Sequence, residues 1–401
     1  MEQHGTPQTD AAARPAALGV NKRPPRADQL QFLRFLAFCL VFIWHANDWS
    51  FSFFSGGVGA ACAVSFFFML SGLATGYTHF EDDIAVTPRA IGAYMWRKIK
   101  KLYPLYIFTM LFAVTSSKIP KLVAQHDFAG LKEPLTLLLR NALMIQSWFT
   151  SDYFSYNGVG WFISAMIFMY LLTLPLLALA GKIRRSRRPA AGYCVMIAGC
   201  MLVSTLYCYL MPGEGWEFTE YVFPVARMWE YAIGIGLGCL TRLILQRHPE
   251  SRPARRRLFT LAELAVFALW IAMPYTPYER WSLTIARWLV PNALLLLTFA
   301  IGEGGLSRVF RARPLVALGD LSFECFLLHG LILTRYSKEL AALQGGRAGN
   351  ALRQSRQAGE NLTQNSALGN AFNLLLCLLL TLMLARLIHG AKRPERLASP
   401  K

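Results

Sequence analysis

The sequence predicts an all-α integral membrane protein of about ten transmembrane helices, and three observations support this prediction. Of the 401 residues, 54% are hydrophobic and 16% are charged, whereas a soluble domain usually carries about 25% charged residues. The apolar residues form blocks of roughly 17 to 25 residues, the length that crosses a hydrocarbon core of about 30 Å. Lys and Arg cluster between these blocks, as residues that set membrane topology do.

The apolar blocks give the expected positions of the helices. They lie at 29–48, 57–79, 102–119, 131–148, 159–181, 191–211, 223–245, 258–275, 284–302, 315–336 and 369–389. If segment 131–148 does not cross, every basic cluster lies on one side of the membrane; if it crosses, clusters 97–101 and 182–188 lie on opposite sides. The segment also carries Arg140 in its middle, which is costly inside a bilayer. We therefore expect an interfacial or re-entrant segment there, about ten crossings elsewhere, and both termini in the cytoplasm.

The chain divides into one membrane domain with a tail at each end. Residues 1–28 are polar and rich in Ala, Pro and Arg, and we expect a disordered cytoplasmic tail. Residues 29–390 form the expected membrane domain, and residues 391–401 a basic cytoplasmic tail. The net charge of +18 does not predict a nucleic-acid partner, because the basic residues lie between apolar blocks rather than on one soluble face. The eight cysteines form no C-x-x-C pair and no histidine spacing resembles a ligand set, so no metal site is expected.

The first apolar segment holds Arg34 and His45, the main functional candidates. Eleven residues make three helical turns plus about 20°, so both side chains share one helix face, about 16 Å apart along the axis. This arrangement suits a cavity that connects the two faces of the membrane. An equally good interpretation is that Arg34 extends to the inner headgroups and His45 lies at the outer interface.

Other polar residues inside the apolar segments are also candidates, because ionisable groups there are expensive. Arg227 and Glu230 are spaced to pair on one helix. His329 lies at a depth similar to that of His45 and could face the same cavity, although a structural role is at least as good an interpretation. Glu324 and Ser71 are weaker candidates, and helix packing explains Ser71 better than nucleophilic chemistry does.

The cytoplasmic run Arg97, Lys98, Ile99, Lys100 and Lys101 allows two interpretations. It fits a positive-inside anchor. It also fits a clamp for the phosphates of an anionic donor, with Arg97, Lys98 and Lys101 as the contacts.

Together these residues resemble the acyltransferase-3 family of membrane O-acyltransferases, from about residue 27 to residue 390. The resemblance rests on ordered motifs: Arg34 with His45 for R-x10-H, Phe66 to Gly72 for F-F-x-L-S-G, Lys101-Leu102-Tyr103-Pro104 for the end of R-x-x-R-I-Y-P, Trp161 to Tyr170 for W-S-L-x-x-E-x-x-F-Y, Arg227 to Gly234 for R-x-x-E-F-x-x-G, and Leu318 to His329 for L-G-x-x-S-Y-x-x-Y-L-x-H. Two positions depart from the pattern. Lysines stand at 98 and 101 where the family has arginines, and Met166 stands where the family has a Glu.

The resemblance implies transfer of an acyl group, usually acetyl from acetyl-CoA, to a hydroxyl of a cell-envelope glycan or lipid-linked sugar, by a multi-pass protein of the cell membrane in contact with membrane lipid. In this interpretation His45 is the general base or acyl relay, and Arg34 orients the donor or neutralises charge beside it. Acyl-CoA is then a substrate, and no permanently bound cofactor is expected. Two other hypotheses remain: a transporter or flippase of an anionic lipid-linked substrate, with Arg34, Arg227 and Glu230 along its path, and a catalytically silent binder.

Overall fold

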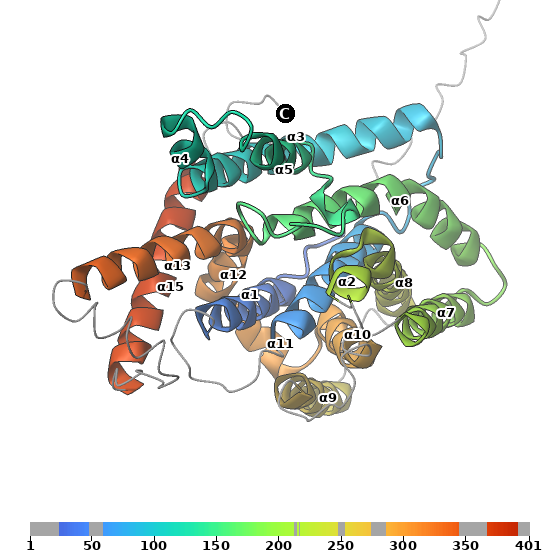
Figure 1. The fold of residues 1–401 in the computed structure, drawn as a ribbon. Coiled ribbons are helices and arrows are strands. Elements are labelled where there is room, and N and C mark those ends of the chain that lie inside the picture. Colours follow the sequence, from blue (N-terminus) through green and yellow to red (C-terminus); the bar gives the residue numbers. More distant parts are fainter. Residues whose placement is uncertain are drawn as a thin grey trace, which may run out of the picture.

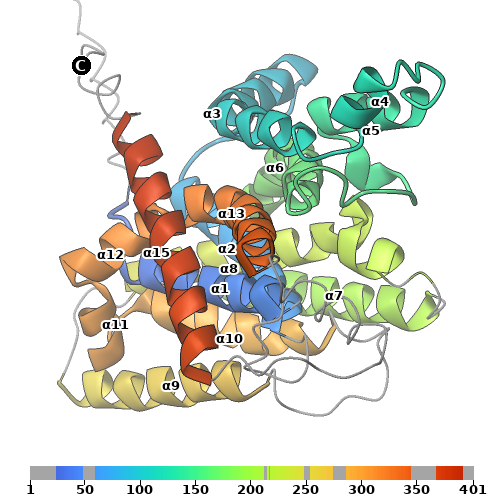
Figure 2. The same cartoon turned by 60° about the vertical axis from the view of Figure 1, so that its left-hand side comes forward.

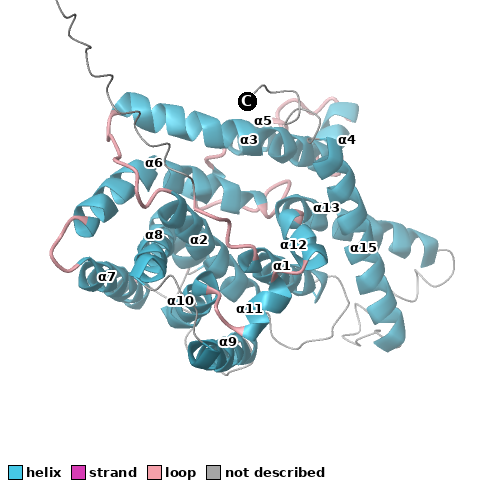
Figure 3. Ribbon diagram, turned by 180° about the vertical axis from the view of Figure 1, so that it is seen from behind, coloured by secondary structure: helices cyan, strands magenta, loops and turns pink. Residues whose placement is uncertain are grey.

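The computed structural model describes residues 24–47, 59–211, 215, 217–247, 253–273, 286–344 and 367–391. Within these ranges the chain forms helices joined by turns and loops, and no strand (Figure 3). The helices are α1 (Gln29–Asn47), α2 (Gly59–Thr78), α3 (Pro88–Val114), α4 (Ile119–Ala124), α5 (Lys132–Ala142), η1 (Gln146–Trp148), α6 (Gly160–Arg184), α7 (Pro189–Leu210), η2 (Glu217–Val222), α8 (Pro224–Arg247), α9 (Pro253–Ala272), α10 (Ala286–Ile301), α11 (Gly305–Phe310), α12 (Arg313–Asp320), α13 (Ser322–Gln344) and α15 (Ala367–Ala391). The expected fold class, an all-α membrane protein, is confirmed.

Length and composition identify the helices that can cross a membrane. In the described residues, α1, α2, α6, α7, the η2–α8 stretch and α15 are long and apolar enough, and the bent pair α12–α13 makes a seventh if it counts as one span. The remaining expected crossings fall on α3, α9 and α10, which are helical but shorter in apolar length or richer in charge. The total of about ten crossings and the side of each terminus remain predictions. Most of tail 1–28 and all but one residue of tail 391–401 lie outside the described residues.

Segment 131–148 contains α5, a helix of 11 residues, followed by the short 3₁₀ helix η1. At 1.5 Å per residue, α5 is about 16 Å long, roughly half of a hydrocarbon core. It lies beside α3 (Figure 1). Arg140 stacks on the ring of Phe149, with its guanidinium carbon 3.9 Å from the ring centroid. The short length agrees with the expectation that this segment does not cross.

Glycines hold α2 and α8 in close contact. A Cβ on Gly72 would collide with the carbonyl oxygen of Tyr231, and a Cβ on Gly234 would collide with that of Met69. The same is true of Gly76 and Gly238 one turn further along their helices. Small residues at these positions let two backbones approach inside a membrane, where apolar side chains gain little from leaving lipid.

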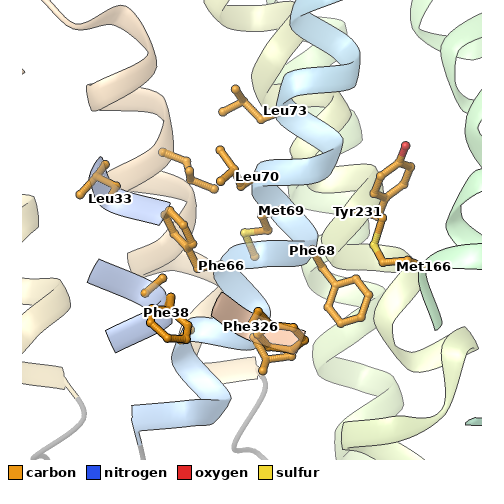
Figure 4. Packing of buried hydrophobic residues seen from close by; sticks show 14 of the residues in the cluster. Leu33, Phe38, Phe66, Phe68, Met69, Leu70, Leu73, Met166, Tyr231 and Phe326 are labelled. Carbon is orange, nitrogen blue, oxygen red and sulfur yellow. The ribbon is translucent and has the colours of Figure 1, made fainter. Parts of the chain in front are cut away.

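Helix α1 lies in the interior, in contact with α2, α10, α11, α12, α13 and α15 (Figure 2). Its buried face, with Leu33, Phe38 and Phe42, joins a cluster that includes Phe66 on α2 and Phe326 on α13 (Figure 4). The central position of α1 explains how one helix can reach two separate cavities.

The expected span 315–336 is not one straight helix. It consists of α12 and α13, which meet at Leu321 with a bend of 57°. The Ser322 hydroxyl donates to the carbonyl oxygen of Gly319 at 2.7 Å, which satisfies an acceptor that a continuous helix would have paired internally. Gly319 also packs against the backbone of Gln31, where a Cβ would collide. The break therefore presents Ser322 to α1.

Candidate active site

An inner cavity of about 530 Å³ lies beside the N-terminal half of α1, the end expected at the cytoplasm. Arg34 projects from α1 into its wall, where its Nε donates to the Ser322 hydroxyl at 2.6 Å and its Nη1 donates to Gln31 Oε1 at 3.2 Å. Ser71 of α2 and Met166 of α6 also line this cavity. The helix break thus orients the Arg34 guanidinium, and Met166 makes the adjoining wall apolar.

An outer cavity of about 410 Å³ lies near the other end of α1. His45 lines it, together with residues at and just after the end of α3, the loop before α6 and one face of α13. These residues are Phe112, Ala113, Ser116, Ser117, Tyr156, Asn157, Gly158, Val159, Gly330, Leu331, Thr334 and Arg335. The helix face shared by Arg34 and His45 therefore meets the inner cavity at one end and the outer cavity at the other.

His45 of α1 and His329 of α13 form a direct pair, with His45 Nδ1 3.3 Å from His329 Nε2. His329 Nδ1 lies 2.7 Å from the carbonyl oxygen of Phe326, and His45 Nδ1 lies 2.9 Å from that of Val41. A carbonyl can only accept, so we assign the proton of each neutral ring to Nδ1. The single Nδ1–H of His45 is then shared between the carbonyl oxygen of Val41 and His329 Nε2, and Nε2 of His45 carries the lone pair. A neutral imidazole in this tautomer can take a proton at Nε2.

Three phenylalanines, which we call the aromatic layer (Phe67, Phe162 and Phe326), form one wall of the inner cavity, and one of them, Phe326, also contacts His329. All three line the inner cavity, and none lines the outer one. Their ring centroids are 5.3 to 6.2 Å apart, within the range of aromatic contact. The ring of Phe326 is also 5.9 Å from that of His329. The side chain of Phe326 therefore lies between the inner cavity and His329.

None of the three expected donor contacts lines the inner cavity, but Lys98 stacks on a residue that does. Lys98 places its ammonium over the rings of Tyr94 and Tyr170, at 5.2 and 5.6 Å from their centroids, and Tyr170 lines the cavity. Arg97 and Lys101 are exposed and line neither cavity.

Arg26 is a basic residue at the inner cavity that was not among the predicted site residues. It lines the cavity and forms ion pairs with Asp28, at 3.4 Å, and with Asp320. It lies in a basic stretch before the first helix, and that sequence pattern does not predict a position in the cavity wall.

The other candidates lie away from the two cavities. Arg227 and Glu230 are fully buried and pair at 3.2 Å, with the Arg227 guanidinium over the ring of Phe68. They line neither cavity, so the path that a transporter would need does not run past them in this conformation. Glu324 forms an ion pair with His389 of α15 at 3.3 Å. These contacts fit structural roles that tie helices together. Within the described residues no cluster of side chains could hold a metal ion.

Asn157 and Arg335 also line the outer cavity, and neither was predicted as a site residue. Asn157 lies in a loop without a recognisable motif. Arg335 lies six residues after His329 on α13, and a charge near the outer end of a predicted span was a signal that could have identified it.

Comparison with known proteins identifies the family of the chain. A family profile described as "Acyltransferase domain", that of the acyltransferase-3 family, matches residues 28–389. The chain belongs to the acyltransferase-3 family. It is 29% identical over 356 residues to a protein named Acyltransferase MdmB from Streptomyces mycarofaciens, covering 82% of this chain and 84% of the relative. No solved structure matches the chain. The protein is therefore a membrane enzyme that transfers acyl groups, as the resemblance of its motifs predicted.

Proposed function

We propose that this enzyme transfers an acyl group, acetyl from acetyl-CoA, to a hydroxyl of a cell-envelope glycan or lipid-linked sugar at the outer face of the cell membrane. The observation that carries the proposal is the pairing of His45 with His329 at the outer cavity, on the helix that carries Arg34 to the inner cavity. A donor from the cytoplasm and an acceptor from outside would then approach one imidazole from opposite sides.

The acyl transfer needs a base, because a neutral sugar hydroxyl is a poor nucleophile. His45 Nε2 takes the hydroxyl proton as the oxygen attacks the thioester carbonyl carbon. The carbon–sulfur bond then breaks, and the imidazolium returns the proton to the leaving thiolate. The products are the O-acyl ester and free CoA. His329 holds His45 in the tautomer that leaves Nε2 as the base, so His329 acts as a positioning residue.

The donor side of the proposal uses the inner cavity. Its volume of about 530 Å³ is within the ordinary range of small-molecule sites. Arg34 faces the cavity and supplies a fixed positive charge that orients the anionic donor, about 16 Å along α1 from the imidazole where the thioester reacts. Lys98, at the end expected at the cytoplasm, supplies positive charge for the phosphates of CoA, whereas the charge of Arg26 is already neutralised by Asp28 and Asp320. Movement of the aromatic layer admits the acyl group to His45.

The test is acyl transfer by the purified protein in lipid nanodiscs, with radiolabelled acetyl-CoA and a glycolipid extract of the native envelope as acceptor. We expect labelled ester in the glycolipid with the wild type, and a loss of at least about 100-fold with His45→Ala. His79→Gln is the matched control, because His79 lies at the cytoplasmic end of α2 and pairs with Asp82 instead of lining a cavity.

Label transfer that survives in His45→Ala would overturn the role of His45. Absence of transfer from acetyl-CoA with every glycolipid fraction, in a protein that still unfolds cooperatively, would overturn the proposed donor and acceptor.

A further inference from the structure

The outer cavity contains a polar site that the mechanism above does not use. Its walls come from the end of α3, the loop before α6 and the outer part of α13. Apart from His45, its polar side chains are hydroxyls, one amide and one guanidinium. Hydroxyl and amide groups of this kind bind polyols, so the lining fits an acceptor rich in hydroxyls.

Asn157 is buried, and its amide group is held in one orientation. Its Nδ2 donates to the carbonyl oxygen of Leu327 at 3.0 Å. This bond turns the amide oxygen, which can only accept, away from Leu327. Among the described residues no donor lies within hydrogen-bond distance of that oxygen. An acceptor hydroxyl in the cavity could supply the missing donor.

Arg335 gives the cavity its charge. The guanidinium lies over the ring of Phe112, 5.5 Å from the centroid, and its Nη2 donates to Thr115 Oγ1 at 3.3 Å. These contacts hold the group against the wall formed by α3. None of the described residues that line the outer cavity carries a carboxylate. An Arg in such a site favours a carboxylate or phosphate, whose oxygens it can bind in pairs.

We propose that the outer cavity binds an acceptor that carries both hydroxyls and an acidic group, a phosphate or a carboxylate, with Arg335 on the acidic group and Asn157 on a hydroxyl. The inference rests on the proposed function, because it specifies the class of acceptor. Arg335 then determines specificity by charge, and His45 acts on a hydroxyl of the same molecule.

The test measures binding directly and needs no catalysis. Glucose 1-phosphate, glucuronate and glucose are titrated into the purified protein in a neutral detergent, followed by saturation-transfer NMR. We expect both acidic probes to bind about tenfold more tightly than glucose, as one charge-assisted contact allows. Arg335→Gln should remove this preference and leave glucose binding unchanged. Arg308→Gln is the matched control, because it removes an exposed arginine on α11 that lines neither cavity.

A lipid phosphate could satisfy the same guanidinium, and a second arm separates this source. Titration of glucose 1-phosphate is repeated in nanodiscs of phosphatidylcholine with and without phosphatidylglycerol. Unchanged affinity supports a soluble or glycan acidic group, whereas competition by phosphatidylglycerol would overturn the proposal in favour of a headgroup site.

Equal binding of glucose and glucose 1-phosphate to the wild type, or equal losses in Arg335→Gln and Arg308→Gln, would also overturn it. The proposed function fails separately. Charge-selective binding without acyl transfer would support the acceptor site and contradict the proposed function. Acyl transfer that does not depend on acceptor charge would support the proposed function and contradict the acceptor site.

Discussion

His45 and His329 come from helices at opposite ends of the chain, and their ring nitrogens Nδ1 and Nε2 lie 3.3 Å apart. Because of this hydrogen bond, the orientation and tautomer of the His45 ring depend on the position of the His329 ring. In the proposed mechanism, this contact makes His329 a positioning residue for His45.

Replacement of His329 should affect turnover more than substrate binding. We expect His329→Leu to lower kcat about 10- to 100-fold with little change in KM, because one of the two acceptors that orient His45 is lost. The double variant with His45→Ala should be no slower than His45→Ala alone, since both residues act as one unit. Additive losses in steady-state kinetics would show that His329 acts independently of His45.

Two neighbouring basic residues, Lys98 and Arg97, distinguish direct donor binding from general attraction of the donor. Lys98 borders the inner cavity through Tyr170, whereas Arg97 is exposed and lines neither cavity. We expect Lys98→Gln to raise the KM for acetyl-CoA a few-fold and Arg97→Gln to leave it unchanged, since only the former charge lies near the bound donor. Kinetics with varied acetyl-CoA measure this difference. An equal rise in both variants would indicate that the whole basic run attracts the donor from a distance.

The aromatic layer should block reagents that enter from outside. In a protein whose accessible native cysteines are replaced by Ser, we expect Ser71→Cys to react with a membrane-impermeant maleimide from the cytoplasmic side only. Adding Phe326→Ala should allow reaction from the outer side as well, because the ring between the inner cavity and His329 is removed. Phe38→Ala is the control, since Phe38 also contacts His329 but does not line the inner cavity. Labelling from outside in the Ser71→Cys parent would contradict a closed layer.

The contact between α2 and α8 predicts a strong effect of one methyl group. We expect Gly234→Ala to destabilise the protein by about 1–3 kcal/mol, because its Cβ would collide with the backbone of α2. Gly199→Ala on α7 should be neutral or slightly stabilising, since nothing lies within 4 Å of its Cβ and Ala favours a helix. Thermal unfolding in detergent compares the two. Equal melting temperatures would mean that the two helices can separate at no cost.

Much of the fold could be predicted from the sequence, because hydrocarbon thickness restricts helix length and backbone pairing so strongly. The apolar blocks all contain helices, and the short α5 lies where Arg140 made a crossing unfavourable. The break at Leu321 was not predicted, because it depends on Ser322 and Gly319 meeting α1, and such contacts between distant segments leave no periodic signal.

The candidate site could be predicted only in part, for the same reason. Helical spacing placed Arg34 and His45 on one face, and the ordered motifs identified the family. The basic run 97–101 allowed two interpretations, because basic residues near a membrane both set the topology and bind phosphates. Asn157 and Arg335 belong to the site through tertiary contacts alone.

The aromatic layer has an electrical consequence. Two cavities reach toward it from opposite faces, so the hydrocarbon barrier is thinnest there. The membrane potential then falls mainly across the residues between the two cavities instead of across about 30 Å of hydrocarbon. A unit charge that crosses the whole potential changes energy by about 2.3 kcal/mol per 100 mV. Any step that moves a proton or a thiolate past Phe326 should therefore be voltage-dependent, and the enzyme should run at different rates in energised and depolarised membranes.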